Sequence, residues 1–235
     1  MNSPPDIKAS DWSRIKLVAF DVDGTLYNQH AMQLYMMRDL MVHTIATRSL
    51  NVLSVLRSYR RIRERMGGEE TRNFEAVLVA ETAKAVGCTE AIVRNIVADW
   101  MEKRPLPYLA RCMYQGLPDL FAGLKRNGKT VAILSDYPAQ EKLAAMGLAA
   151  DHVICSGDKE VGYLKPHPRG FERLLQAANV RADQAVLIGN RPERDGLAAL
   201  RVGAKALIYS YKPISGWQTF SSYGAPLFAP LLLQK

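Results

Sequence analysis

The sequence predicts an α/β fold in which a parallel sheet carries helices on both faces and an all-helical segment is inserted after the first strand. Residues 15–20 form an apolar run of strand length. From about residue 117, short apolar runs alternate with helical segments, as in parallel α/β sheets. Residues 30–112 show helical periodicity throughout. A chain of 235 residues is long enough for such a core and an insert.

The first strand ends at two aspartates. Asp21 and Asp23 follow residues 15–20 directly and precede Gly24 and Thr25. Ligands bind at the carboxyl ends of strands in an open parallel sheet, so we expect both carboxylates at that edge. Asp-Gly is also ordinary turn chemistry, which leaves the alternative that these aspartates only cap a turn.

Residues 32–66 contain apolar side chains at helical intervals and no proline, which predicts one or two helices. Asn73 is placed to cap a helix over 74–86, and Thr89 to cap another over 90–103. We therefore predict that residues 31–112 form a separate helical unit. Residues 1–30 and 113–235 would then make up the α/β core.

The second half of the chain supplies the other strands of the sheet. The expected strands are short apolar runs between helices: 130–134, 152–155, 185–188 and 206–209. The chain from Lys212 is rich in Pro, Gly and aromatic residues, which predicts irregular chain draped on the core. An aromatic segment that binds a partner is the alternative for this tail.

Composition narrows the class of protein. Hydrophobic residues make up 48% and charged residues 23%, as in ordinary globular proteins. No apolar window approaches the roughly 18 residues of a membrane span, and the first residues do not resemble a signal peptide. We expect a cytoplasmic protein without a membrane anchor. The three cysteines and four histidines are scattered, which argues against a zinc site and for reduced thiols.

The net charge of +8 suits an anionic partner. Much of the excess lies between Arg48 and Arg65, where a solvated helix face is an equally simple explanation. Nucleic acid is disfavoured, because the basic run has few interleaved aromatic residues and no recognised binding module is visible.

Further polar residues follow the predicted strands. Ser135 comes directly after 130–134, and Lys165 lies in a Lys-Pro pair ahead of a predicted helix. Asn190 and Asp195 follow 185–188. Each is a weak signal alone, but together they would surround the two aspartates with a hydroxyl, an ammonium and metal-binding oxygens.

In their order and spacing these residues resemble the four motifs of the haloacid dehalogenase (HAD) superfamily, most of whose members are magnesium-dependent phosphohydrolases. The resemblance covers residues 13–30 and 113–210. It implies a Rossmann-like core, and it implies that 31–112 are the helical cap of this group. One position departs from the pattern: Asn190 stands where the family usually has an aspartate.

The resemblance implies a phosphatase that acts on a small phosphorylated metabolite. Asp21 would attack phosphorus and form an aspartyl-phosphate, and Asp23 would serve as general acid and then general base. Ser135 and Lys165 would hold the phosphate. A phosphomutase of the same superfamily, and a catalytically weakened domain that binds a phosphorylated ligand or a protein partner, remain as alternatives.

The resemblance also implies Mg²⁺ as cofactor, held by Asp21, the Asp23 backbone carbonyl and Asn190, with Asp195 in support. An asparagine oxygen can coordinate Mg²⁺, although the lost charge should weaken binding.

Substrate selection is expected in the helical insert, because the core residues all address the phosphate. Arg48, Arg57, Arg60 and Arg61 are the candidates to contact a second anionic group, which would favour carboxylated or multiply phosphorylated molecules. The sequence does not fix the oligomeric state.

Overall fold

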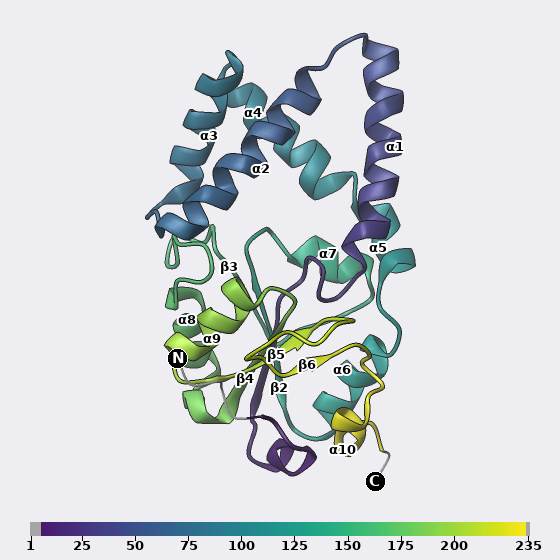
Figure 1. Ribbon diagram of the computed structural model, residues 1–235, viewed down its shortest axis with the longest axis vertical. Coiled ribbons are helices and arrows are strands. Elements are labelled where there is room, and N and C mark those ends of the chain that lie inside the picture. Colours follow the sequence, from purple (N-terminus) through teal and green to yellow (C-terminus); the bar gives the residue numbers. More distant parts are fainter. Residues whose placement is uncertain (1–5, 234–235) are drawn as a thin grey trace.

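The computed structural model describes residues 6–233, and over these residues the strands form one parallel sheet in the order β3-β2-β1-β4-β5-β6 (Figure 1). The strands are β1 (Leu17–Phe20), β2 (Thr130–Ser135), β3 (His152–Cys155), β4 (Ala185–Gly189), β5 (Lys205–Tyr209) and β6 (Thr219–Phe220). The prediction of a parallel α/β sheet is confirmed. β1 lies between β2 and β4, so its carboxyl end is central in the sheet.

Helices cover both faces of the sheet. Successive strand residues point to opposite sides, so each face presents apolar side chains that the helices bury. Val18 and Phe20 of β1 pack in an apolar cluster with the first group of helices, and Leu17 and Ala19 pack with the second. The first group comprises α6 (Leu117–Arg126), α7 (Gln140–Ala145) and α10 (Ala229–Leu232); the second comprises α8 (Arg169–Ala178) and α9 (Leu197–Arg201). Short helical turns complete the core: η1 (Ala9–Ser13), η3 (Ala182–Gln184), η4 (Pro192–Gly196) and η5 (Pro226–Phe228).

The inserted segment is helical and stands over the sheet (Figure 1). Its elements are α1 (Gln29–Thr47), α2 (Asn51–Glu69), α3 (Phe74–Val86), α4 (Glu90–Val97), η2 (Ala98–Lys103) and α5 (Leu106–Cys112). It has its own apolar cluster, which includes Val55, Phe74, Leu78 and Val93.

One of the two predicted helix caps is present. The Thr89 hydroxyl accepts the amide hydrogen of Ile92 at 3.3 Å, as expected of a residue that caps α4. The prediction for Asn73 is wrong, because this residue adopts a left-handed conformation and its side chain caps nothing. Its backbone amide instead donates to the Gly162 carbonyl at 2.8 Å, which ties the start of α3 to a loop of the core.

The tail is more ordered than predicted. β6 extends the sheet, and Phe220, Tyr223 and Phe228 are buried, so these aromatic side chains are not available to a partner. The Tyr223 hydroxyl donates to the Thr25 carbonyl at 2.7 Å. The tail thus supports the loop that carries the aspartates.

Within residues 6–233, no helix is both long and apolar enough to span a bilayer. The three cysteines are free thiols, in agreement with the prediction from their spacing.

Candidate active site

Asp21 directly follows β1, at the carboxyl end of this strand. Its backbone amide donates to the Ile188 carbonyl of β4 at 2.9 Å, which fixes it in register with the neighbouring strand. Its side chain is buried, and its carboxylate accepts from Lys165 Nζ at 2.6 Å and from Thr25 Oγ1 at 3.0 Å. Burial raises the pKa of Asp21 to about 7, against the opposing effect of the Lys165 ammonium.

Lys165 is buried between two carboxylates. Its Nζ lies 2.6 Å from Asp21 and 2.6 Å from Asp195. Burial disfavours the ammonium, yet Asp195 and Asp21 together hold the pKa of Lys165 above its ordinary value. The lysine is therefore a fixed cation at the centre of the site.

Asp23 is held by a cation and a phenol. Lys142 Nζ lies 2.6 and 2.9 Å from its two carboxylate oxygens, and the Tyr27 hydroxyl donates to one of them. Burial favours the neutral acid, but Lys142 and Tyr27 hold the pKa of the Asp23 carboxyl below its ordinary value. Asp23 is thus ionised at neutral pH.

The loop after β4 meets the loop after β1. Asp195 Oδ2 accepts the backbone amides of Asn190 and Arg191 at 3.1 and 3.0 Å, and the Asn190 amide oxygen lies 3.4 Å from the Thr25 hydroxyl. Gly24 has φ +90°, and a Cβ on it would lie 2.3 Å from Asn190 Nδ2. Glycine is needed here to let the Asn190 amide approach.

Ser135 and its neighbour Asp136 lie at the end of β2. Ser135 is fully buried, accepts the Tyr137 backbone amide at 3.2 Å, and does not line the cavity described below. Asp136 does line it, and its carboxylate accepts from Ser156 Oγ at 2.7 Å and from the Lys165 backbone amide at 3.2 Å. The predicted phosphate-binding serine is therefore close to the site but turned toward the backbone.

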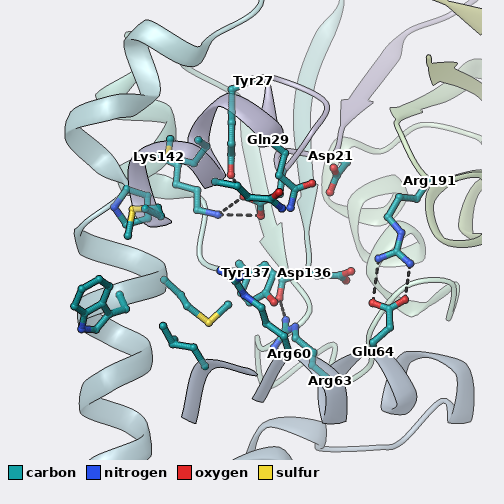
Figure 2. Close-up of a pocket in the computed structure, with 18 of the residues that line it drawn as sticks. Asp21, Tyr27, Gln29, Arg60, Arg63, Glu64, Asp136, Tyr137, Lys142 and Arg191 are labelled. Atoms are coloured by element: carbon teal, nitrogen blue, oxygen red, sulfur yellow. Dashed lines mark hydrogen bonds and ion pairs between the residues drawn. The ribbon is translucent and has the colours of Figure 1, made fainter. Parts of the chain in front are cut away.

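A cavity of about 650 Å³ opens between these residues and the helical insert. Figure 2 shows Arg60 and Arg63 on one side of it and Asp21 and Lys142 on the other. Of the four arginines named as candidates from the sequence, Arg57 and Arg60 line the cavity. The other two predicted arginines do not: Arg48 ends α1 and is exposed, and Arg61 is exposed on α2.

Arg63 joins the insert to the strand tip. This buried side chain donates to the Asp136 carbonyl and lies 4.0 Å from the centre of the Tyr137 ring, a cation–π contact. Sequence reasoning placed Arg63 only within a basic run. Its spacing on α2, four residues after the buried Tyr59 and three before the buried Met66, is the signal that separates it from solvated arginines.

Lys142 was also missed from the sequence. It lies in a predicted helix that begins close after the β2 tip, and the first residues of such a helix face the same edge as the strand tips. The topology therefore contained a signal for Lys142, although nothing marked which side chain would turn inward.

A second link between insert and core involves Glu64. Its carboxylate lies 2.5 Å from Arg191 and 3.0 Å from Arg194, and Arg194 also donates to the Lys165 carbonyl at 2.6 Å. The hydrogen bond from Arg191, reinforced by Arg194, lowers the pKa of Glu64 to about 2. The orientation of α2 over the site thus depends in part on this ion pair.

We expect Glu64→Gln to lower stability in a pH-dependent way. A depressed folded-state pKa means that the stabilisation is complete above the unfolded value of about 4.3 and is lost as the pH falls toward about 2. The side chain is 59% exposed, so the expected loss is no more than about 1 kcal/mol. Urea unfolding of both proteins at pH 7 and pH 3 measures it.

Glu90→Gln is the matched control, because Glu90 pairs with Arg94 inside α4 and links no two parts of the molecule. A Glu64→Gln difference that stayed constant between pH 7 and pH 3 would contradict the role of the charge.

The oxygen atoms at this site are of the kind that Mg²⁺ binds. Asp21 and Asn190 offer oxygens on the two sides of the Thr25 hydroxyl, and both are ligands of the hard type that Mg²⁺ accepts. Asp195 uses both carboxylate oxygens for Lys165 and for backbone amides. Within residues 6–233, no three His, Cys, Asp or Glu side chains gather to hold a metal. Since Mg²⁺ usually keeps several waters and needs one or two carboxylates, the donors fit.

Phosphatases are among the proteins to which the chain is similar. The chain is 28% identical over 200 residues to the phosphoglycolate phosphatase of Rhodospirillum rubrum, a match that covers 83% of this chain and 80% of the relative. It is 29% identical over 136 residues to the phosphoserine phosphatase of Thermus thermophilus, which covers 57% and 53% of the two chains.

The structure of the HAD-hydrolase YfnB from Bacillus subtilis bound to magnesium superposes with a TM-score of 0.63 at 15% identity, over 87% of this chain and 94% of that one, and supports the fold. The model of the haloacid dehalogenase-like hydrolases matches residues 15–203. The resemblance seen in the sequence motifs is confirmed: the chain belongs to the haloacid dehalogenase-like hydrolases.

Proposed function

We propose that the protein hydrolyses phosphoric monoesters through a phosphorylated Asp21. The observation that carries this proposal is the Asp21 carboxylate, buried at the tip of β1, paired at 2.6 Å with Lys165 and facing a cavity of about 650 Å³. The named activities of the relatives, phosphoglycolate and phosphoserine phosphatase, are of the same chemical class.

Asp21 is the proposed nucleophile. Its carboxylate attacks phosphorus, the ester oxygen leaves, and the aspartyl-phosphate is then cleaved by water. Lys165 holds the carboxylate in place and offsets negative charge that gathers as the phosphoryl group approaches. Thr25 keeps the second carboxylate oxygen oriented.

Asp23 is the proposed acid and base. Lys142 and Tyr27 fix its carboxylate and keep it ionised, which is the form that accepts a proton from the water of the second step. To protonate the leaving oxygen in the first step, Asp23 must first take up a proton when the substrate binds. The lysine and tyrosine therefore favour the hydrolytic half of the reaction.

The residues that would hold Mg²⁺ are Asp21, the Asp23 carbonyl and Asn190, and Asp195 would support them by fixing Lys165 and the loop after β4. When bound, the ion would neutralise charge on the phosphoryl oxygens. Ser135 is proposed as a further phosphate contact, which would require its hydroxyl to turn from the Tyr137 amide.

The direct test is release of inorganic phosphate from p-nitrophenyl phosphate with and without Mg²⁺. Hydrolysis that needs Mg²⁺ and saturates with substrate supports the proposal. A protein that binds phosphate esters but releases no phosphate would be a binding domain. One that passes the phosphoryl group to a sugar phosphate and not to water would be a phosphomutase.

We expect neutralisation of the cavity arginines to weaken substrate binding. In the double variant Arg57→Gln/Arg60→Gln, KM for phosphoglycolate, which carries a second anionic group, should rise at least about 100-fold, because two hydrogen bonds to a charged group are lost and each is worth about 1.5–3 kcal/mol. Steady-state kinetics measures this change.

The control is Arg48→Gln/Arg61→Gln, which removes the same charge from exposed positions outside the cavity. Equal KM values in the two double variants would show that the arginines act only as a solvated face.

A further inference from the structure

The main cavity continues into a second one. Met37, Leu40 and Leu53 line both, and the second, of about 240 Å³, reaches the connection between α1 and α2. Its other lining residues are Met41, Thr44, Ile45 and Leu50. Together the two cavities form one groove, here called the α1–α2 groove, that runs from Asp21 away from the sheet.

The polarity of this groove changes along its length. α1 leaves the core with Gln29, Met32, Gln33 and Met36 in the lining and continues with Met37, Met41 and Ile45. At 1.5 Å per residue, positions 29 to 45 of a helix span about 24 Å.

α2 shows the same change in the reverse direction along its sequence. Its lining begins far from the core with Leu50 and Leu53 and ends at the core with Arg57 and Arg60. Both walls therefore carry their amide and cationic side chains at the end beside Asp21, among apolar ones, and the far end is apolar apart from Thr44.

The apolar end of the groove is open to solvent. Met41 is 63% exposed, Ile45 71% and Leu50 63%. Contiguous exposed apolar side chains of this size commonly mark a binding surface. A phosphorylated substrate of two or three carbons would fill only the polar end and would leave this lining uncovered.

We propose that the substrate is an amphiphilic phosphomonoester, whose phosphate binds at Asp21 and Lys165 and whose extended apolar chain lies along the α1–α2 groove. The proposal rests on the proposed function and names its substrate class. It is supported by the continuity of the groove with the site and by the match between its charge gradient and that of such a molecule.

A series of monoalkyl phosphates from butyl to dodecyl, used below their micelle concentrations with Mg²⁺, tests the proposal. Burial of each methylene corresponds to a gain of about fourfold in kcat/KM until the groove is filled. We expect octyl phosphate, with four more methylenes, to exceed butyl phosphate by about 250-fold in kcat/KM.

Two neighbouring residues of α1 give a matched pair of variants. Met41 lines the groove, whereas Val42 is equally exposed, at 62%, and lies outside it. Met41→Asp should cut the octyl-to-butyl ratio at least tenfold, and Val42→Asp should leave it unchanged. Circular dichroism of both variants verifies that they fold.

Several results would overturn the proposal. Hydrolysis of butyl phosphate with no gain for longer chains would refute the amphiphilic substrate and leave the phosphatase intact. If no ester were hydrolysed, including p-nitrophenyl phosphate, both the amphiphilic substrate and the phosphatase activity would be refuted. Sedimentation measures whether the protein forms dimers. If kcat/KM did not change with chain length, and both Met41→Asp and Val42→Asp dissociated such dimers, the apolar end would be a contact between copies of the chain.

Discussion

Asp21→Asn is expected to lose at least about 10⁴-fold in kcat, because an amide cannot form the phosphorylated intermediate. Burial raises the pKa of Asp21, so its charge costs stability at neutral pH, and the neutral amide should leave the unfolding temperature unchanged or raise it. Activity on p-nitrophenyl phosphate and thermal unfolding of the same sample separate the two effects.

Asp39→Asn is the control for this variant, since Asp39 accepts from Tyr108 at 2.7 Å outside the cavity. It should retain wild-type kcat. The wild-type protein should also yield a phosphorylated form during turnover that hydroxylamine cleaves, as acyl phosphates are cleaved. Activity in Asp21→Asn within tenfold of wild type would sink the nucleophile assignment.

Lys165→Met is expected to destabilise the protein by about 3–5 kcal/mol and to abolish activity. The substitution leaves the buried carboxylates of Asp21 and Asp195 without the cation that lies 2.6 Å from each. Urea unfolding measures the loss of stability.

A double-mutant cycle shows whether Lys165 acts through Asp21. In Asp21→Asn/Lys165→Met one of the two carboxylates is already neutral, so Lys165→Met should cost less there than in the wild type. Penalties that add to within about 0.5 kcal/mol would mean that the two residues are not coupled.

The strand tips could be predicted from the sequence because topology alone brings them together. Asp21, Lys165 and Asp195 lie far apart in the chain, yet the loops that follow the parallel strands β1, β3 and β4 bring them to one edge. β6 was missed for a physical reason. It has two residues and exists only because the tail returns to pair with β5, a long-range event that local periodicity does not encode.

The helical side of the site was harder to predict. Counting basic residues groups Arg57, Arg60 and Arg61 together, and helical periodicity does not separate them, because at about 100° per residue Arg61 lies about 40° from Arg57 and Arg60 about 60° from it on the other side. Of the three, Arg57 and Arg60 line the cavity and Arg61 does not. Which way the whole helix α2 is rotated over the core depends on contacts such as Glu64 with Arg191, and these are visible only in three dimensions.

The Tyr223 hydroxyl, bound to the Thr25 carbonyl 198 positions earlier, has a consequence for biosynthesis. Residues 15–203 contain all the motifs of the family, yet the turn bearing the two aspartates is buttressed by an aromatic ring that the ribosome adds later. A nascent chain synthesised only as far as β5 would already contain every residue with a proposed catalytic role. The turn with the two aspartates would still lack the hydrogen bond from Tyr223. Folding of the site would then be completed by the docking of residues 210–233.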